Sequence, residues 1–310
     1  MHENDKSKSI NIAIENQPAF TPLIIKHIEK HNISFEKIVN RTNIKSIFTW
    51  LFALIKQKAT ISHYLMGYYY WFFYIIPKIL GKTVILHWIG TDVYRMTMLK
   101  KNHKLWWKIR VWLLNRLDKH LVVSHALADE LELAGIKADV VPLIPNLKKD
   151  YKITFPKKHK IFVYLPEHRV KFYGGDIVFK LAKEFNYIEF LITKHSGKDA
   201  PQLSNIKYFS WVDDIETIWN EITIYLRITE HDGLSHTILE ALNRGKHVIW
   251  SQKFPHCYHA TNYEEAKTAL QQALQQTTIN QAGIDFIEKE YNVEKLTQNF
   301  VDLYGSMNRK

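Results

Sequence analysis

Short apolar runs alternate with longer amphipathic stretches along most of the chain, and this alternation limits the possible folds. The runs predict strands at Ile10–Ile14, Phe35–Val39, Ile61–Met66 and Thr83–His87, and the stretches predict helices at Pro18–Lys30, Ile44–Lys56 and Tyr68–Leu80. Alternating strands and helices predict parallel sheets covered by helices on both faces. With 310 residues the chain fits two such α/β domains better than one.

The boundary between the two domains is predicted near residue 150. The segment Pro142-Leu-Ile-Pro-Asn146 carries two prolines, which stiffen a connection, and Lys148 and Lys149 follow it. We therefore expect a first domain at residues 1–150 and a second at residues 151–310, each with a doubly wound, Rossmann-like sheet.

The segment from Ile222 to Trp250 has the features of one strand–loop–helix–strand unit. An apolar run to Ile228 is followed by a polar loop, a helix capped by Ser235, and the strand His247–Trp250. Such a loop lies at the carboxyl end of a strand and leads into a helix N-terminus, where α/β sheets bind ligands and attract anions. Asp232 in the loop and Glu240 in the helix can then face one pocket and accept hydrogen bonds from sugar hydroxyls. The alternative is an ordinary crossover with solvated acids.

The same segment resembles a known signature. Asp232-Gly-Leu, five residues, Glu240-Ala-Leu, and then Gly and Val-Ile resemble the donor site of retaining GT-B glycosyltransferases, in particular glycosyltransferase family 4, which has Glu where this chain has Asp232. The resemblance implies two Rossmann-like domains that face each other across a cleft. It also implies that Asp232 contacts the donor sugar, that Glu240 holds the ribose, and that Gly233, Leu234 and Ser235 line the donor site.

Two other loops extend the resemblance. The sequence His87-Trp-Ile-Gly-Thr-Asp-Val is similar to the family's His-Gly-x-Asp loop, which implies that His87 and Asp92 approach the transferred sugar as catalytic residues together with Asp232. Arg169 and Lys171 precede a predicted helix at Gly175, and two cations beside a helix N-terminus suit a diphosphate.

The resemblance also bears on two segments towards the C-terminus. It implies that Trp211 and Val212 lie at the nucleotide base, although packing of Trp211 in the core is the interpretation that we favour. It implies as well that the last predicted helix, Val293–Leu303, crosses back onto the first domain.

Positive charge is concentrated in the first domain. The formal net charge is +11, and residues 1–150 hold 22 Lys and Arg against 12 Asp and Glu. Residues 95–119 alone carry eight basic side chains and one acid, with Trp106, Trp107 and Trp112 among them. A basic amphipathic helix with tryptophans is typical of an anionic membrane surface. The alternative is a helix that packs on the sheet and leaves its basic face in water.

Other features exclude some classes of protein. The single cysteine, Cys257, excludes an internal disulfide and suits a reducing compartment. The polar N-terminus does not resemble a signal peptide, and the aromatic run Tyr64–Ile76 is shorter than the about 20 residues of a membrane span. The first strand is followed by no glycine-rich phosphate loop, and His256–His259 lacks a second ligand cluster, so neither a bound cofactor nor a metal is expected.

The family resemblance implies a retaining, metal-independent hexosyltransferase that uses a UDP- or GDP-sugar. Its acceptor would be lipid-linked or a polysaccharide, as in polysaccharide biosynthesis, and the protein would be cytoplasmic and peripheral at the inner face of the membrane. Nucleic acid is not the expected partner because the acids of residues 229–240 would repel phosphates. Two alternatives stay open: a non-catalytic protein of this fold that binds nucleic acid or anionic surfaces, and a sugar-nucleotide epimerase.

Overall fold

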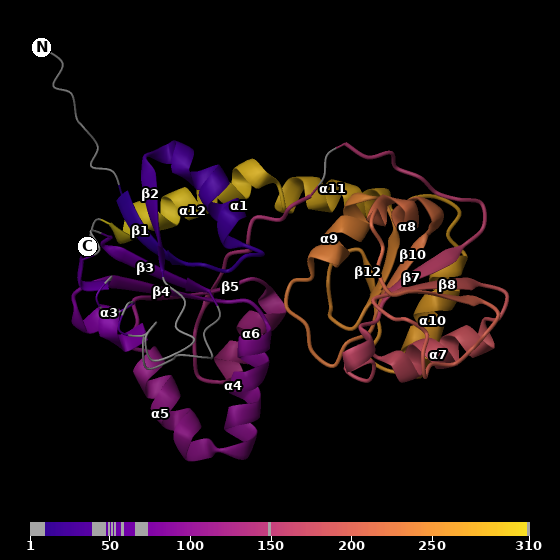
Figure 1. Ribbon diagram of the computed structural model, residues 1–310, viewed down its shortest axis with the longest axis horizontal. Coiled ribbons are helices and arrows are strands. Elements are labelled where there is room, and N and C mark those ends of the chain that lie inside the picture. Colours follow the sequence, from indigo (N-terminus) through magenta and orange to yellow (C-terminus); the bar gives the residue numbers. More distant parts are fainter. Residues whose placement is uncertain are drawn as a thin grey trace, which may run out of the picture. The chain divides into compact units, whose positions relative to one another are not determined.

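The computed structural model describes residues 10–38, 48, 50, 52, 54–56, 59–65, 74–147 and 150–308 (Figure 1). About half of the helix predicted at Ile44–Lys56 lies outside these residues. Of the helix predicted at Tyr68–Leu80, residues 68–73 lie outside them, and the described part contains α3 (Ile75–Ile79). The chain divides into two compact units, one formed by Met1–Pro145 with Val293–Lys310 and the other by Asn146–Asn292.

The first unit contains a six-stranded sheet in the order β2-β1-β3-β4-β5-β6, and all pairs are parallel. Its strands are β1 (Ile10–Glu15), β2 (Ile33–Ile38), β3 (Ile61–Leu65), β4 (Thr83–Trp88), β5 (Lys119–Val122) and β6 (Asp139–Val140). Its described helices are α1 (Thr21–Ile28), η1 (Glu29–His31), α3 (Ile75–Ile79), α4 (Thr91–Asn102), α5 (Lys104–Leu114), α6 (His125–Leu133) and α12 (Val293–Met307).

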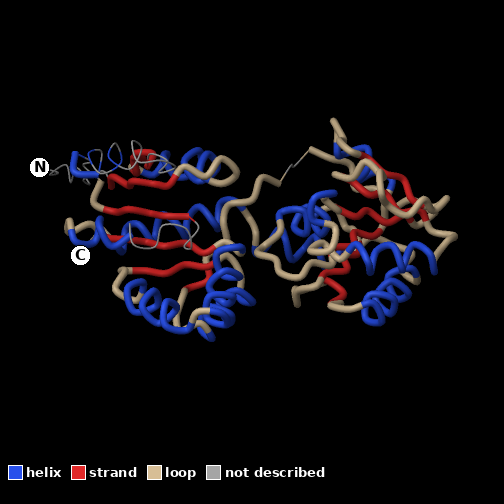
Figure 2. The backbone as a smooth tube through the Cα atoms, turned by 60° about the horizontal axis from the view of Figure 1, so that its bottom comes forward, coloured by secondary structure: helices blue, strands red, loops and turns tan. Residues whose placement is uncertain are grey.

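The second unit contains another six-stranded parallel sheet, in the order β12-β11-β10-β7-β8-β9. Its strands are β7 (Lys160–Tyr164), β8 (Glu189–Thr193), β9 (Ile206–Phe209), β10 (Ile224–Arg227), β11 (His247–Trp250) and β12 (Cys257–His259). Its helices are η3 (Glu167–Arg169), α7 (Gly175–Glu184), α8 (Ile215–Glu221), α9 (His236–Asn243), α10 (Tyr263–Leu274) and α11 (Gln281–Glu290). Within each unit the strands lie side by side with helices around them (Figure 2). The prediction of two Rossmann-like domains is confirmed.

The central strands are buried on both faces, which explains why they are continuous apolar runs rather than alternating ones. In β4 the side chains of Val84, Ile85 and Leu86 are fully buried. In the second unit, Val178 and Leu181 of α7 pack with the strand residues Ile161 and Ile224 in one apolar cluster. Helix α7 covers the sheet with its apolar side because the chain places such residues three and four positions apart.

The sequence suggested one helix for the basic stretch at residues 95–119, but the structure contains two. Helix α4 ends at Asn102, α5 begins at Lys104, and Lys119 already belongs to β5. His103 between the helices has φ −143° and ψ 65°, which is outside the helical range and breaks the rod. The two helices form a hairpin that projects from the sheet of the first unit (Figure 1).

Candidate functional site

The strand order of the second sheet reverses between β7 and β10, which makes this the topological switch point at which such sheets bind ligands. The loops that follow these two strands are joined, because the N–H of Glu230 donates to the carbonyl oxygen of Phe172 at 2.9 Å. Gly174 permits this close packing. Its φ is +68°, and a Cβ there would lie 2.4 Å from the carbonyl oxygen of Ile228.

The two predicted diphosphate cations lie in the loop after β7. Arg169 ends η3 and stacks its guanidinium 3.9 Å above the ring of Phe172, and Lys171 follows two residues later. Both side chains are exposed, and the structure gives neither a carboxylate within ion-pair distance among the residues that it describes. Arg169 and Lys171 are therefore two exposed cations in the loop at the switch point of the second sheet.

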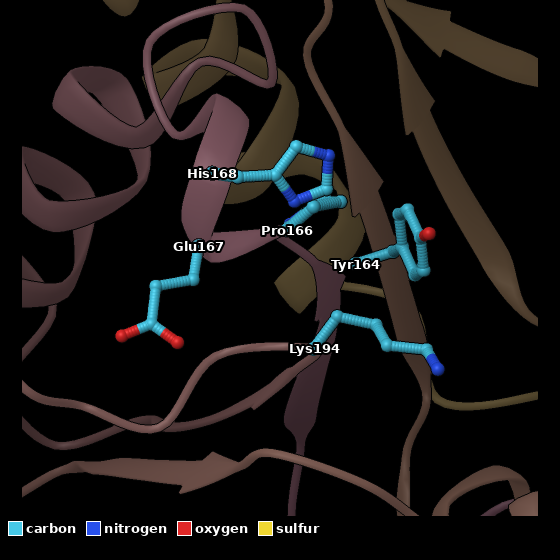
Figure 3. Close-up of a pocket in the computed structure, with 5 residues that line it drawn as sticks. All are labelled: Tyr164, Pro166, Glu167, His168 and Lys194. Atoms are coloured by element: carbon cyan, nitrogen blue, oxygen red, sulfur yellow. The ribbon is translucent and has the colours of Figure 1, made fainter.

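A hollow of about 530 Å³ opens along the first residues of the same loop (Figure 3). It is lined by Tyr164 at the end of β7, by Pro166, Glu167 and His168 of the loop after β7, and by Lys194 after β8. The hydroxyl of Ser196 donates to the Glu167 carboxylate at 2.7 Å, and this bond lowers the pKa of Glu167, while burial raises the pKa of Tyr164. The hollow thus offers a neutral phenol and a lysine ammonium on one side, with the Glu167 carboxylate directed away from them (Figure 3).

Trp211 is not a core residue, which corrects the interpretation favoured from sequence. Its side chain is 67% exposed, and its indole N–H donates to Asp213 at 3.0 Å. The ammonium of Lys194 lies 3.5 Å above the Trp211 ring. The Lys194 side chain lines the hollow and also stacks on the indole, so Trp211 lies next to the hollow.

The carboxylate of Asp232 is hydrogen-bonded by residues of the second unit. Arg227, the last residue of β10, donates from Nε to Oδ2 at 2.5 Å and from Nη2 to Oδ1 at 3.2 Å. The N–H of Gly233 and the indole N–H of Trp250 donate to the same carboxylate at 3.1 and 3.3 Å. Sequence reasoning missed Arg227 and treated its strand as purely apolar. An arginine inside a buried run, five residues before an acid, was the available signal.

Ser235 precedes the first residue of α9, as predicted, but its hydroxyl does not cap the helix. It bonds instead to the hydroxyl of Thr237 at 2.8 Å, and Thr237 also accepts from the buried Tyr225 at 2.9 Å. The remaining predicted donor residues, Gly233, Leu234 and Glu240, are all partly buried on this loop and helix.

His87 is fully buried in the first unit. Its Nε2 lies 2.8 Å from the carbonyl oxygen of Val141, and its ring stacks on that of His63 with 5.5 Å between centroids. Burial lowers the pKa of His87 to about 4, so the imidazole is neutral at pH 7. In this conformation protein atoms enclose the ring, and the contact of His87 with the transferred sugar stays a prediction.

Asp92 is also fully buried, and its carboxylate serves the backbone of its own loop. It accepts hydrogen bonds from the N–H groups of Ile89, Gly90 and Val93 at 3.1, 2.8 and 3.0 Å. This arrangement closes the turn before α4, where Gly90 has φ 140°, a value that favours glycine. The carboxylate predicted to hold a hydroxyl thus shapes the loop in this structure.

The site residues predicted from sequence therefore form two groups. Arg169, Lys171, Asp232 and Glu240 belong to loops and a helix that begin at the carboxyl edge of the second sheet, whereas His87 and Asp92 belong to the first unit. In the residues that the structure describes, no three His, Cys, Asp or Glu side chains are grouped so that they could hold a metal ion.

Solved structures with the same fold were found, although no protein-family model and no curated protein matches the sequence. The sucrose-phosphate synthase of Thermosynechococcus elongatus has a TM-score of 0.72 and 12% identity over 97% of this chain and 99% of its own. Anabaena HepE, solved with UDP and glucose, has a TM-score of 0.68 and 12% identity over 96% and 100%. WaaG, a glycosyltransferase involved in lipopolysaccharide biosynthesis, has a TM-score of 0.62 and 11% identity over 95% and 99%.

These similarities define the class of fold. The chain has the GT-B fold, with two Rossmann-like domains, over nearly its full length. The expectation of this fold from the residues around Asp232 and Glu240 is confirmed. In the described part of the chain, no helix combines the length and the apolar character that a membrane crossing requires.

Proposed function

We propose that the protein is a glycosyltransferase that transfers a hexose from a nucleotide-sugar donor with retention of configuration. The observation that carries the proposal is the pair of exposed cations, Arg169 and Lys171, at the switch point of the second sheet, beside the loop that leads into α9. A helix N-terminus and two unpaired cations bind a diphosphate without any other charged group. The likeness to HepE, solved with UDP and glucose, supports UDP as the nucleotide.

The donor would lie along this edge with its base towards the hollow in Figure 3. Tyr164 and Trp211 offer aromatic surfaces there, and Lys194, which lines the hollow and stacks on Trp211, would lie between the base and the phosphates. Glu240, eight residues beyond Asp232, would accept hydrogen bonds from the ribose. Gly233, Leu234 and Ser235 would face the sugar from the loop before α9.

The proposed reaction requires stabilisation of the negative charge on the departing diphosphate. As the bond between the sugar and the diphosphate breaks, negative charge develops on the leaving oxygens, and preorganised cations and helix-end N–H groups stabilise that charge. Arg169, Lys171 and the N-terminus of α9 supply these groups, so the proposed reaction needs no metal ion. Asp92 would shape the loop before α4, and the role expected for His87 at the transferred sugar stays a prediction.

We further propose that the acceptor is lipid-linked or a membrane-bound polysaccharide precursor. Leu105, Trp106, Ile109 and Trp112 of α5 are 69%, 61%, 37% and 58% exposed, so this helix presents apolar side chains to water. Exposed Lys101, Lys104 and Lys108 accompany them. Apolar side chains with lysines beside them suit the headgroup boundary of an anionic membrane. With one cysteine in the chain, a reducing cytoplasmic location at the inner face fits best.

A thermal-shift panel of UDP-, GDP-, ADP- and CDP-sugars tests the donor site. A ligand at a hundred times its dissociation constant adds about 2.7 kcal/mol, which raises Tm by several degrees. We expect a shift with UDP-sugars that Glu240→Ala abolishes and that Glu288→Ala, a change at an exposed acid of α11, retains. If no nucleotide-sugar shifts the wild-type protein, the proposed function is wrong.

A further inference from the structure

The carboxylate of Asp232 is saturated by groups of the protein. Oδ1 accepts from Arg227 Nη2 at 3.2 Å and from the Gly233 N–H at 3.1 Å. Oδ2 accepts from Arg227 Nε at 2.5 Å and from Trp250 Nε1 at 3.3 Å. A carboxylate has about four acceptor positions, two on each oxygen. A sugar hydroxyl could bond to Asp232 only by displacing one of these four donors.

Burial makes that displacement unfavourable. The side chains of Arg227 and Asp232 are only 9% and 14% exposed, and Trp250 is 1% exposed. The Arg227 guanidinium also lies 5.3 Å from the ring of Tyr173 and 5.8 Å from that of Tyr164. A buried bidentate pair that loses one partner leaves an uncompensated charge, which is strongly destabilising.

The same loop is fixed at two further points. The N–H of Thr229 donates to the hydroxyl of Ser251 at 3.0 Å, and the side-chain amide of Gln252 donates to the carbonyl oxygen of Asp232. Both partners follow β11, whereas Arg227 ends β10. The loop before α9 is thus tied to the ends of two adjacent strands.

The ion pair has an electrostatic consequence for an anionic ligand. An unpaired carboxylate at the edge where Arg169 and Lys171 stand would repel a diphosphate and offset part of their attraction. Because Arg227 neutralises Asp232, the local charge from these four residues is positive. An aspartate suits this arrangement because its short side chain reaches back to the strand that its own loop leaves.

We propose that Asp232 is a positioning residue, paired with Arg227, and not a ligand of the transferred sugar. The pair fixes the loop at residues 229–234, orients the N-terminus of α9, and neutralises the Asp232 carboxylate near Arg169 and Lys171. The inference rests on the proposed function, since it concerns the donor site, and it replaces the sugar contact that the family resemblance implies for Asp232.

The decisive comparison is between a nucleotide-sugar and the corresponding free nucleoside diphosphate. A side chain that touches the sugar contributes only to binding of the nucleotide-sugar, whereas a residue that positions the loop contributes to binding of both ligands. We would measure the Kd of UDP-glucose and of UDP by calorimetry for the wild-type protein, Asp232→Asn, Arg227→Lys and the double variant.

We expect Asp232→Asn and Arg227→Lys to weaken both ligands by the same factor, about tenfold, and to lower Tm by several degrees. The double variant should bind both ligands no more weakly than the single variant that binds them more weakly, because both changes break the same ion pair. Arg227→Lys keeps the charge but loses the bidentate geometry, so it tests the pair even if Asp232→Asn folds poorly.

Two results would count against the inference in different ways. If Asp232→Asn weakened UDP-glucose about tenfold or more and left UDP unchanged, Asp232 would be a sugar ligand and the inference would be overturned while the proposed function stood. If the wild-type protein bound neither UDP nor any nucleotide-sugar, the proposed function would fail, and the inference would fail with it.

Discussion

The hydroxyl of Tyr304 on α12 lies 2.7 Å from Nδ1 of His63 on β3, so the last helix of the chain is bonded to the first sheet. Both side chains are fully buried, and the Phe300 ring packs against His63 with 6.2 Å between centroids. Residues 241 positions apart therefore share one core, and the first unit is complete only when the end of the chain is in place.

Removing this hydroxyl should destabilise the first unit. Tyr304→Phe keeps the ring but leaves Nδ1 of His63 without its partner, which costs about 1–3 kcal/mol of unfolding free energy. Chemical denaturation followed by fluorescence measures the change. Tyr187→Phe is the matched control, because Tyr187 is 73% exposed, and it should leave the unfolding free energy unchanged. A Tyr304→Phe protein as stable as the wild type would show that the bond contributes nothing.

Acid should weaken the same unit through its buried histidines. Burial lowers the pKa of His87 to about 4 and that of His63 well below its usual 6.5. Below pH 6.5 these histidines are protonated in the unfolded chain but stay neutral in the folded chain. Their contribution to the unfolding free energy is therefore fully present above pH 6.5 and is lost as the pH falls towards 4. His87 alone would account for about 3 kcal/mol over that range.

The variant His87→Gln isolates this contribution. Glutamine can still donate to the Val141 carbonyl oxygen, but it does not titrate, so the slope of unfolding free energy against pH should fall by up to about 1.4 kcal/mol per unit between pH 4.5 and 6.5. Equal slopes for His87→Gln and the wild type would refute the assignment.

The strands of both sheets could be predicted because burial on both faces requires continuous apolar runs. The strand at His247–Trp250 has the bounds that the sequence predicts, and the strands predicted at Ile10–Ile14 and Thr83–His87 each extend one residue further. The break at His103 could not be predicted, because the residues on either side of it favour a helix equally well and the turn depends on how α4 packs against α5 and α6.

The candidate site was predicted in outline only. The spacing in the sequence placed Asp232 in a loop and Glu240 in the helix that follows it, because these positions depend only on local structure. It could not show that Asp232 turns back to Arg227, or that Asp92 accepts three backbone N–H groups, because both depend on the path of a loop in space. A carboxylate near a glycine has the same sequence signature whether it binds a ligand or its own backbone.

The packing of the two site loops depends on Gly174, which provides a further test. In Gly174→Ala a methyl group would lie 2.4 Å from the Ile228 carbonyl oxygen at a φ of +68°, so we expect a loss of about 2 kcal/mol or more and weaker nucleotide binding. Gly305→Ala is the control, since nothing lies within 4 Å of its added methyl and α12 gains up to about 1 kcal/mol of helix propensity. Equal effects of the two changes would contradict the packing argument.

The exposed apolar side chains of α5 predict binding to anionic membranes. Trp107 on the same helix is tied to the Ala134 carbonyl oxygen at 3.1 Å, whereas Trp106 and Trp112 are exposed and Arg116 stacks 3.2 Å above Trp112. Replacing Trp106 and Trp112 with serine should therefore leave Tm almost unchanged and reduce binding to phosphatidylglycerol vesicles about tenfold or more.

Vesicle sedimentation over a range of salt concentrations measures this effect. Binding of the wild-type protein should weaken as salt rises from 50 to 500 mM, because the contribution of the lysines beside these tryptophans is screened. Tyr187→Ser, which removes an even more exposed aromatic ring from the second unit, should bind vesicles as the wild type does. If the double tryptophan variant bound as tightly as the wild type, α5 would not be the membrane-binding surface, and the lipid-linked acceptor would lose its structural support.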